Sequence, residues 1–186
     1  MRDRGEHYLA VELWRVGAVR EGRFRLSSGR ESNIYVDLRR LPSYPRVFRL
    51  ALSLLHSATA SILDDADVIV GVATGGIQWA IGLAILAGVP AGYVRLEGKG
   101  HGLDRRVEAD VKGRALVVDD VATTGGSLIR AIEALRREGY TVRYAAVLVD
   151  RGEGAYDALK GVGVELVSVL GLEDIMRARP STSKPS

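Results

Sequence analysis

The sequence contains no cysteine, which excludes a disulfide framework and any metal site built from thiolates. It has no apolar run long enough to cross a bilayer, and its first residues, MRDRGEHYLAVELW, carry charges where a signal peptide would have an apolar core. No block of basic residues stands out, although the formal net charge is +3, so we expect no nucleic-acid partner. These absences predict a cytoplasmic protein that does not contact a membrane.

The composition is typical of a folded globular chain, with 47% hydrophobic and 26% charged residues. A length of 186 residues suits one domain with a full hydrophobic core, and no linker or internal repeat divides the chain. We therefore expect a single domain over residues 1–178. The polar tail, 179–186, is rich in Pro and Ser, and we expect it to be disordered.

Short apolar runs alternate with expected helical segments from residue 67 to residue 172. Because continuous apolar strands are buried on both faces, this rhythm predicts an α/β fold with a mostly parallel sheet flanked by helices. The expected strands are 67–72, 91–96, 114–120, 141–151 and 164–172, and the expected helices between them are 77–88, 127–139 and part of 152–163. Upstream, the spacing of apolar residues predicts helices at 6–19 and 46–63 and a hairpin at 22–40.

The segment ALVVDDVATTGGS (115–127) has the features of a ligand site. An apolar strand ends in Asp119 and Asp120, and ligands of open parallel sheets bind at the carboxyl ends of strands. The next helix begins near Ser127, and a helix N-terminus offers unpaired N–H groups to a phosphate. The loop between them supplies hydroxyl donors and glycines that permit close approach of the backbone: Thr123, Thr124, Gly125 and Gly126.

The two carboxylates need a separate role, because they would repel that phosphate. Carboxylates accept hydrogen bonds from sugar hydroxyls, or help to hold Mg²⁺ through its water ligands. The loop lacks the Gly-Lys-Ser/Thr of a Walker A motif and the G-x-G-x-x-G of a dinucleotide-binding loop. The segment therefore indicates a ligand with both a ribose diol and a phosphate; the alternative is a surface turn in which an Asp caps the helix.

VVDDVATTGGS resembles the phosphoribosyl pyrophosphate (PRPP) signature of type I phosphoribosyltransferases. The resemblance implies that family's fold, with a small N-terminal hood at residues 1–40 and a mobile catalytic loop. It implies that Asp119 and Asp120 hold the ribose hydroxyls and that the TTGGS loop holds the 5′-phosphate. The implied PRPP-binding residues are Arg95, Lys99, His101, Asp119, Asp120, Val121, Ala122, Thr123, Thr124, Gly125, Gly126 and Ser127.

Three further segments resemble the orotate phosphoribosyltransferase branch: FRLSSGRESNIYVDLR (24–39), YVRLEGKGHG (93–102) and VDRGEG (149–154). The resemblance implies transfer of the phosphoribosyl group from PRPP to orotate, giving orotidine 5′-monophosphate and pyrophosphate in pyrimidine (UMP) biosynthesis. It also implies Mg²⁺ as cofactor, with no direct protein ligand assigned, and a homodimer with shared active sites. The implied catalytic residues are Lys99, His101 and Asp120, and the implied orotate-binding residues are Thr123 and Arg151.

The chemistry of these residue types fits the implied roles. Departing pyrophosphate develops negative charge, which cations placed for the transition state stabilise; Arg95, Lys99 and His101 lie in or beside a glycine-rich segment that can close over the ligands. The planar fork of Arg151 suits a carboxylate, which adenine and hypoxanthine lack.

The sequence departs from the family's pattern at three positions. Lysines that many members carry are replaced by Ser27, Gly75 and Leu96. The segment GVATGGIQ (71–78) stands at the pyrophosphate loop, whose residues are Ala73, Thr74, Gly75 and Gly76, and its backbone N–H groups at a helix start can still bind pyrophosphate.

Two other functions fit the same fold. The first is a purine phosphoribosyltransferase, against which Arg151 and the 24–37 hairpin argue. The second is a PRPP-binding regulator of transcription or RNA, which could have discarded Lys99 and His101, whereas both remain.

Overall fold

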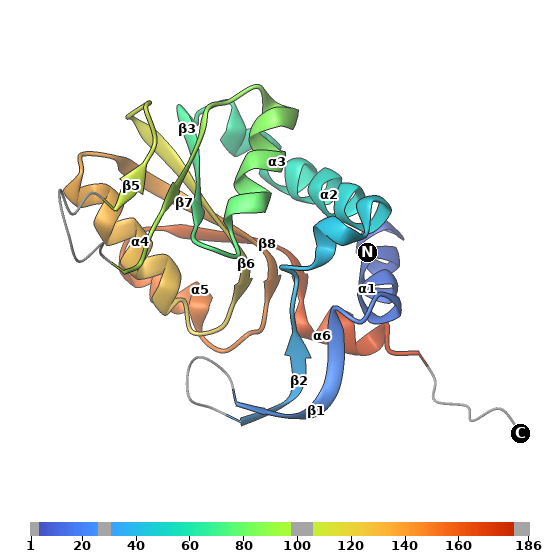
Figure 1. The fold of residues 1–186 in the computed structure, drawn as a ribbon. Coiled ribbons are helices and arrows are strands. Elements are labelled where there is room, and N and C mark those ends of the chain that lie inside the picture. The colour runs from blue at the N-terminus through green and yellow to red at the C-terminus, as the bar shows by residue number, and fades with distance from the viewer. Residues whose placement is uncertain (1–3, 26–30, 98–105, 181–186) are drawn as a thin grey trace, which may run out of the picture.

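The computed structural model describes residues 4–25, 31–97 and 106–180. Within these residues, the main sheet has six strands in the order β5-β4-β3-β6-β7-β8 (Figure 1). Every neighbouring pair is parallel except β4 and β5, which confirms the expected α/β class with a mostly parallel sheet. The strands are β3 (Val68–Val72), β4 (Ala91–Val94), β5 (Val107–Glu108), β6 (Arg114–Ala122), β7 (Thr141–Asp150) and β8 (Glu165–Gly171).

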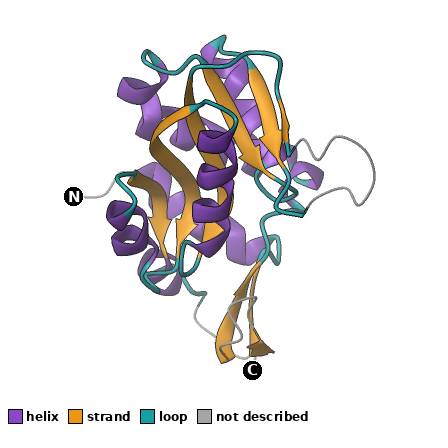
Figure 2. Ribbon diagram, turned by 90° about the vertical axis from the view of Figure 1, so that its left-hand side faces the viewer, coloured by secondary structure: helices purple, strands orange, loops and turns teal. Residues whose placement is uncertain are grey.

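Helices cover both faces of this sheet, and each face has its own core (Figure 2). Alternate residues of a strand point to opposite faces, so Leu116 and Val118 join one core whereas Ala115 and Val117 join the other. The first core includes side chains of α1 (Arg4–Arg15), α2 (Pro45–Leu63), α3 (Ile77–Ala87) and α6 (Leu172–Arg177); the second includes those of α4 (Gly126–Arg137) and α5 (Ala155–Gly161).

Several boundaries differ from those that the sequence patterns predict. The first helix ends at Arg15 rather than continuing to residue 19, because the chain turns at Gly17, whose φ of 71° favours glycine. β5 lies in a stretch expected to be loop and pairs with the edge strand β4. The short helices η1 (Leu41–Ser43) and α6 were not expected. Arg179, expected in the tail, pairs with Glu21 at 2.7 Å.

The hood contains an antiparallel ribbon of β1 (Val19–Arg25) and β2 (Glu31–Val36), which stands apart from the main sheet (Figure 1). Two side chains of the main body, one after β7 and one in α3, bind β2 and the residues that follow it. Arg151, after β7, donates hydrogen bonds to Ser32 Oγ (2.9 Å) and to the carbonyl oxygen of Ile34 (3.3 Å). Gln78 in the first turn of α3 donates to the carbonyl oxygen of Leu38 (3.0 Å). The segment from Ser32 to Leu38 therefore runs from β7 towards the start of α3.

Candidate active site

A pocket of about 750 Å³ lies at the carboxyl ends of β3, β6 and β7 and beside the hood. This is where ligands bind in open parallel sheets. The pocket brings together segments that are far apart in the sequence, including most of the residues that sequence analysis selected. Its lining is Tyr35, Val36, Arg39, Val72, Ala73, Thr74, Gly75, Leu96, Glu97, Asp119, Asp120, Val121, Ala122, Thr123, Gly125, Gly126, Ser127, Leu128 and Arg151.

The paired carboxylates, Asp119 and Asp120, lie near the carboxyl end of β6. Asp119 is only 7% exposed, and its Oδ1 accepts a hydrogen bond from the backbone N–H of Asp120 (2.9 Å). Asp120 Oδ1 accepts one from the N–H of Val121 (2.8 Å). Burial and then the neighbouring Asp120 charge raise the pKa of Asp119 well above its usual value. Burial also raises the pKa of Asp120, although the Val121 N–H and the charge of Arg39 oppose that shift. In both groups burial is the main cause of the shift and disfavours the charged form.

The loop after these acids leads directly into α4. Gly125 precedes the helix with a φ of 82°, and no side chain caps the first turn. A Cβ at this position would lie 2.8 Å from Leu159 Cδ1, so both conformation and packing require glycine. Gly126, Ser127 and Leu128 of this uncapped first turn line the same pocket as Thr123, and a helix N-terminus with unpaired N–H groups is a typical phosphate site.

The expected pyrophosphate loop joins β3 to α3, and the peptide bond between Ala73 and Thr74 is cis. A Cβ at Gly75 would lie 2.7 Å from Asp120 Oδ2, and one at Gly76 would lie 2.6 Å from the backbone nitrogen of Val72. Gly75 thus packs directly on the acid pair, and a lysine there would displace Asp120.

Arg151 is buried, with 7% of its surface exposed, yet it reaches the pocket. Besides its two bonds to the hood, its Nε donates to Glu153 Oε1 at 2.7 Å. The guanidinium carries five N–H groups, so this side chain can hold the hood and still donate to a ligand.

The remaining predicted residues lie elsewhere. Arg95 follows β4 and forms an ion pair with Glu108 of β5, and it is outside the set that lines the pocket. Thr124 and Gly76 adjoin lining residues. Lys99, His101 and Ser27 fall outside the described residues. Leu96 and Glu97, which precede the Lys99 segment, line the pocket.

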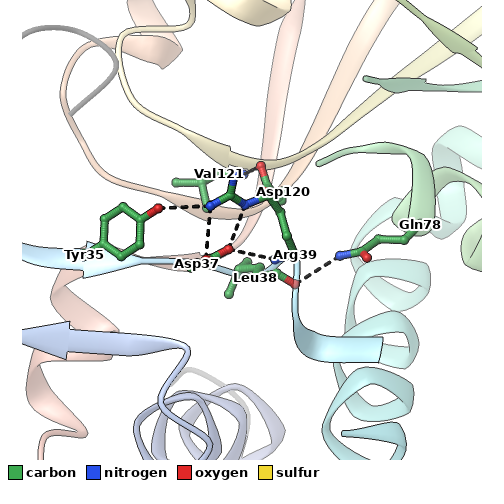
Figure 3. A network of polar contacts seen from close by, with 7 residues as sticks. All are labelled: Tyr35, Asp37, Leu38, Arg39, Gln78, Asp120 and Val121. Atoms are coloured by element: carbon green, nitrogen blue, oxygen red, sulfur yellow. Dashed lines mark hydrogen bonds and ion pairs between the residues drawn. The ribbon is translucent and has the colours of Figure 1, made fainter. Parts of the chain in front are cut away.

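The pocket also includes hood residues to which sequence analysis assigned no role. Arg39 donates from Nε to Asp37 Oδ1 (2.8 Å) and from Nη2 to Asp37 Oδ2 (3.1 Å) and Tyr35 Oη (3.1 Å). Figure 3 shows this guanidinium with Asp120 beside it. Tyr35 stacks on Phe24 across the ribbon, with ring centroids 5.1 Å apart. The alternation of residues 34–37 predicts a strand that includes Tyr35 and Asp37. It does not predict that this part of the chain lies beside β6, which depends on the fold.

Among the described residues, no three His, Cys, Asp or Glu side chains gather in a way that would hold a metal ion. No described helix is long and apolar enough to span a membrane.

Comparisons with known proteins identify the family of this chain. Residues 47–164 match the phosphoribosyl transferase domain family. The orotate phosphoribosyltransferase of Aeropyrum pernix is 52% identical over 169 residues, which are 90% of this chain and 91% of the relative. The crystal structure of orotate phosphoribosyltransferase from Aeropyrum pernix superposes with a TM-score of 0.83 at 48% identity and covers 91% of this chain and 97% of that chain.

A structure of the Mycobacterium tuberculosis orotate phosphoribosyltransferase in complex with PRPP superposes with a TM-score of 0.73 at 35% identity, covering 92% of this chain and 99% of that chain. Each of these comparisons covers 90% or more of this chain. The chain therefore belongs to the phosphoribosyl transferase domain family and, within it, to the orotate phosphoribosyltransferases.

Proposed function

We propose that this protein transfers the 5-phosphoribosyl group of PRPP to orotate, releasing pyrophosphate and forming orotidine 5′-monophosphate for UMP biosynthesis. The observation that carries the proposal is one pocket in which the buried Asp119 and the half-buried Asp120 converge with the uncapped N-terminus of α4 and with Arg151. A ribose diol, a phosphate and a carboxylate are the groups that these three features recognise. Together these groups are those of PRPP and orotate, whereas adenine and hypoxanthine bring no carboxylate to Arg151.

Each part of the pocket has a role in this reaction. Asp119 and Asp120 accept hydrogen bonds from the ribose hydroxyls, and residues 123–127 hold the 5′-phosphate. Arg151 and Thr123 orient orotate, and the backbone of residues 73–76 receives the pyrophosphate. Lys99, His101 and Arg95 supply cations that stabilise the charge developing on the leaving group.

Mg²⁺ fits the donor set at the acid pair. Two adjacent carboxylates whose pKa values are raised by burial, with the charge of Asp120 adding to the shift of Asp119, are stabilised by a nearby cation. Mg²⁺ usually keeps several waters and binds through one or two carboxylates and substrate phosphates, so Asp119 and Asp120 would hold it through water. When bound, it would neutralise part of the charge on the diphosphate.

A homodimer completes the proposal, and α3 offers a surface for it. This helix, IQWAIGLAILA, is apolar on all sides, which is typical of a helix buried on all sides. Trp79, Ala80 and Leu83 pack into the core. The opposite face is exposed: 48% of Ile81, 77% of Ile85 and 54% of Leu86. A second copy of this chain is the partner that we propose for this face, and the sharing of active sites between the two copies stays a prediction. A cytoplasmic location remains a prediction.

The reaction is tested by following the loss of orotate absorbance with PRPP and Mg²⁺. We expect one pyrophosphate released per orotate consumed, and the reverse reaction from orotidine 5′-monophosphate and pyrophosphate. Persistent orotate in the presence of both co-reactants, with protein shown to be folded, would contradict the proposal.

A further inference from the structure

Arg39 lies in the pocket without a part in the roles described so far. It follows the hood ribbon, and 57% of its side chain is exposed. Asp37, only 11% exposed, binds two nitrogens of its guanidinium, and Tyr35 Oη accepts a third hydrogen bond. These contacts fix the plane of a side chain that is otherwise flexible.

The same contacts leave one end of the guanidinium available. Among the described residues, no acceptor is bonded to Nη1 of Arg39, and this nitrogen carries two N–H groups. Asp120 is close enough to act on Arg39 by charge, yet the hydrogen bonds of Arg39 go to Asp37 and Tyr35. A cation held rigidly in this way, beside the acids but not bonded to them, is placed for an anionic ligand.

Two neighbouring contacts locate Arg39 on the pyrophosphate side of the pocket. Leu38, the preceding residue, accepts a hydrogen bond from Gln78 in the first turn of α3, directly after the loop 73–76. Asp120, whose charge acts on Arg39, packs on Gly75 of that loop. Arg151 holds the other end of the hood segment, at Ser32 and Ile34. Arg39 therefore follows the end of the hood segment that Gln78 holds, and Arg151 binds the opposite end.

We propose that Arg39 binds the diphosphate of PRPP and the released pyrophosphate, as a further binding residue for the proposed reaction, on which this inference rests. Its guanidinium supplies a cation from the hood beside Gly75, which packs against Asp120 and has no side chain of its own. Asp37 and Tyr35 are positioning residues that hold the guanidinium in line.

The experiment measures binding of inorganic pyrophosphate with Mg²⁺ by calorimetry and the KM values of the four reactants in both directions. Arg39→Ala should weaken pyrophosphate binding and raise the KM of PRPP by about tenfold or more, as expected for loss of a charge-assisted hydrogen bond. The KM of orotate and of orotidine 5′-monophosphate should change by less than about twofold. Arg39→Lys should restore part of the loss, since the charge returns without the fork.

Arg40→Ala is the matched control, because Arg40 is adjacent, exposed and outside the lining of this pocket; it should leave pyrophosphate binding unchanged. Unaltered pyrophosphate binding in folded Arg39→Ala, or an equal rise in the KM of all four reactants, would overturn the inference. If Arg39→Ala does not fold, Asp37→Ala, which keeps Arg39 but removes both carboxylate contacts of its guanidinium, should weaken pyrophosphate binding selectively, and an unchanged affinity would count against the proposal. Because the calorimetry needs no turnover, wild-type protein inactive towards orotate would refute the proposed function separately.

Discussion

The carboxylate of Asp120 lies against the backbone of Gly75, so closely that a Cβ on residue 75 would sit 2.7 Å from Oδ2. Real Cβ atoms do not approach oxygen at that distance, so one of the two groups must move if residue 75 gains a side chain. Asp120 has a short side chain fixed by the Val121 N–H. The contact links the pyrophosphate loop to the acid pair, although the two are 45 residues apart in the sequence.

Gly75→Ala should therefore damage PRPP use more than it damages the fold. Displaced by the methyl group, Asp120 would no longer meet the ribose hydroxyls, and we expect kcat/KM for PRPP to fall by about tenfold or more. Steady-state kinetics and thermal melting check this together. Gly161→Ala is the control, because a Cβ at Gly161 meets nothing within 4 Å. Full activity in Gly75→Ala would contradict this expectation, because it would mean that Asp120 accommodates the methyl group without losing its contacts to the ribose.

The acid pair should lower the stability of the protein at neutral pH. Because burial raises the pKa of Asp119 and Asp120, the folded chain binds more protons than the unfolded chain once the pH exceeds the usual Asp value. The free energy of unfolding then falls as the pH rises through this window, and it stays lower above the folded pKa values. Asp119→Asn should consequently raise the melting temperature near neutral pH while weakening PRPP use.

Melting curves of the protein without Mg²⁺ or PRPP, from about pH 5 to about pH 8, test this expectation. The exposed Asp110 supplies the control, since Asp110→Asn changes the net charge equally but removes no buried carboxylate. A lower melting temperature in Asp119→Asn at every pH would show that the carboxylate stabilises the strand end instead.

Arg151→Ala should act mainly on orotate. Loss of a buried, charge-assisted contact to the orotate carboxylate should cost about 2–4 kcal/mol in kcat/KM, largely through the KM of orotate. The structure adds a complication, because Arg151 also holds the hood through Ser32. Ser32→Ala removes that tether and keeps the cation, so it separates the two effects. Similar orotate KM values in both variants would assign Arg151 to the hood alone.

Sequence reasoning predicted the parts of this site that are local in the chain. The acids and the loop before α4 lie within one strand-loop-helix unit, whose apolar pattern and glycines mark it directly. Arg39 and Tyr35 could not be placed in the same way, because their position depends on the tethers from Gln78 and Arg151. β5 was missed for a related reason: two residues without an apolar run become a strand only because β4 offers them an edge.

Lys99 and the dimer are tested together by mixing two inactive variants. Lys99→Ala should lower kcat far more than it weakens PRPP binding, because its charge matters as pyrophosphate departs. If the Lys99 segment serves the partner's pocket, a mixed dimer of Lys99→Ala and Asp120→Asn has one intact site. Random exchange makes half of the dimers mixed, so activity should recover to about a quarter of wild type.

Mass spectrometry should confirm the exchange, and Ile85→Glu provides the control. A charge on the exposed face of α3 should prevent the dimer and abolish the recovery. Confirmed exchange without recovered activity would mean that each segment serves its own subunit or that the two sites are coupled, and a single-turnover measurement on the mixed dimers distinguishes these cases.

The base specificity is tested most directly in a single competition. Wild-type protein receives orotate, adenine, hypoxanthine and uracil at equal concentrations, with limiting PRPP and Mg²⁺, and mass spectrometry identifies the nucleotides formed. We predict orotidine 5′-monophosphate as the product, because among these four bases orotate alone brings a carboxylate to Arg151. Formation of adenosine or inosine monophosphate in its place would contradict the account.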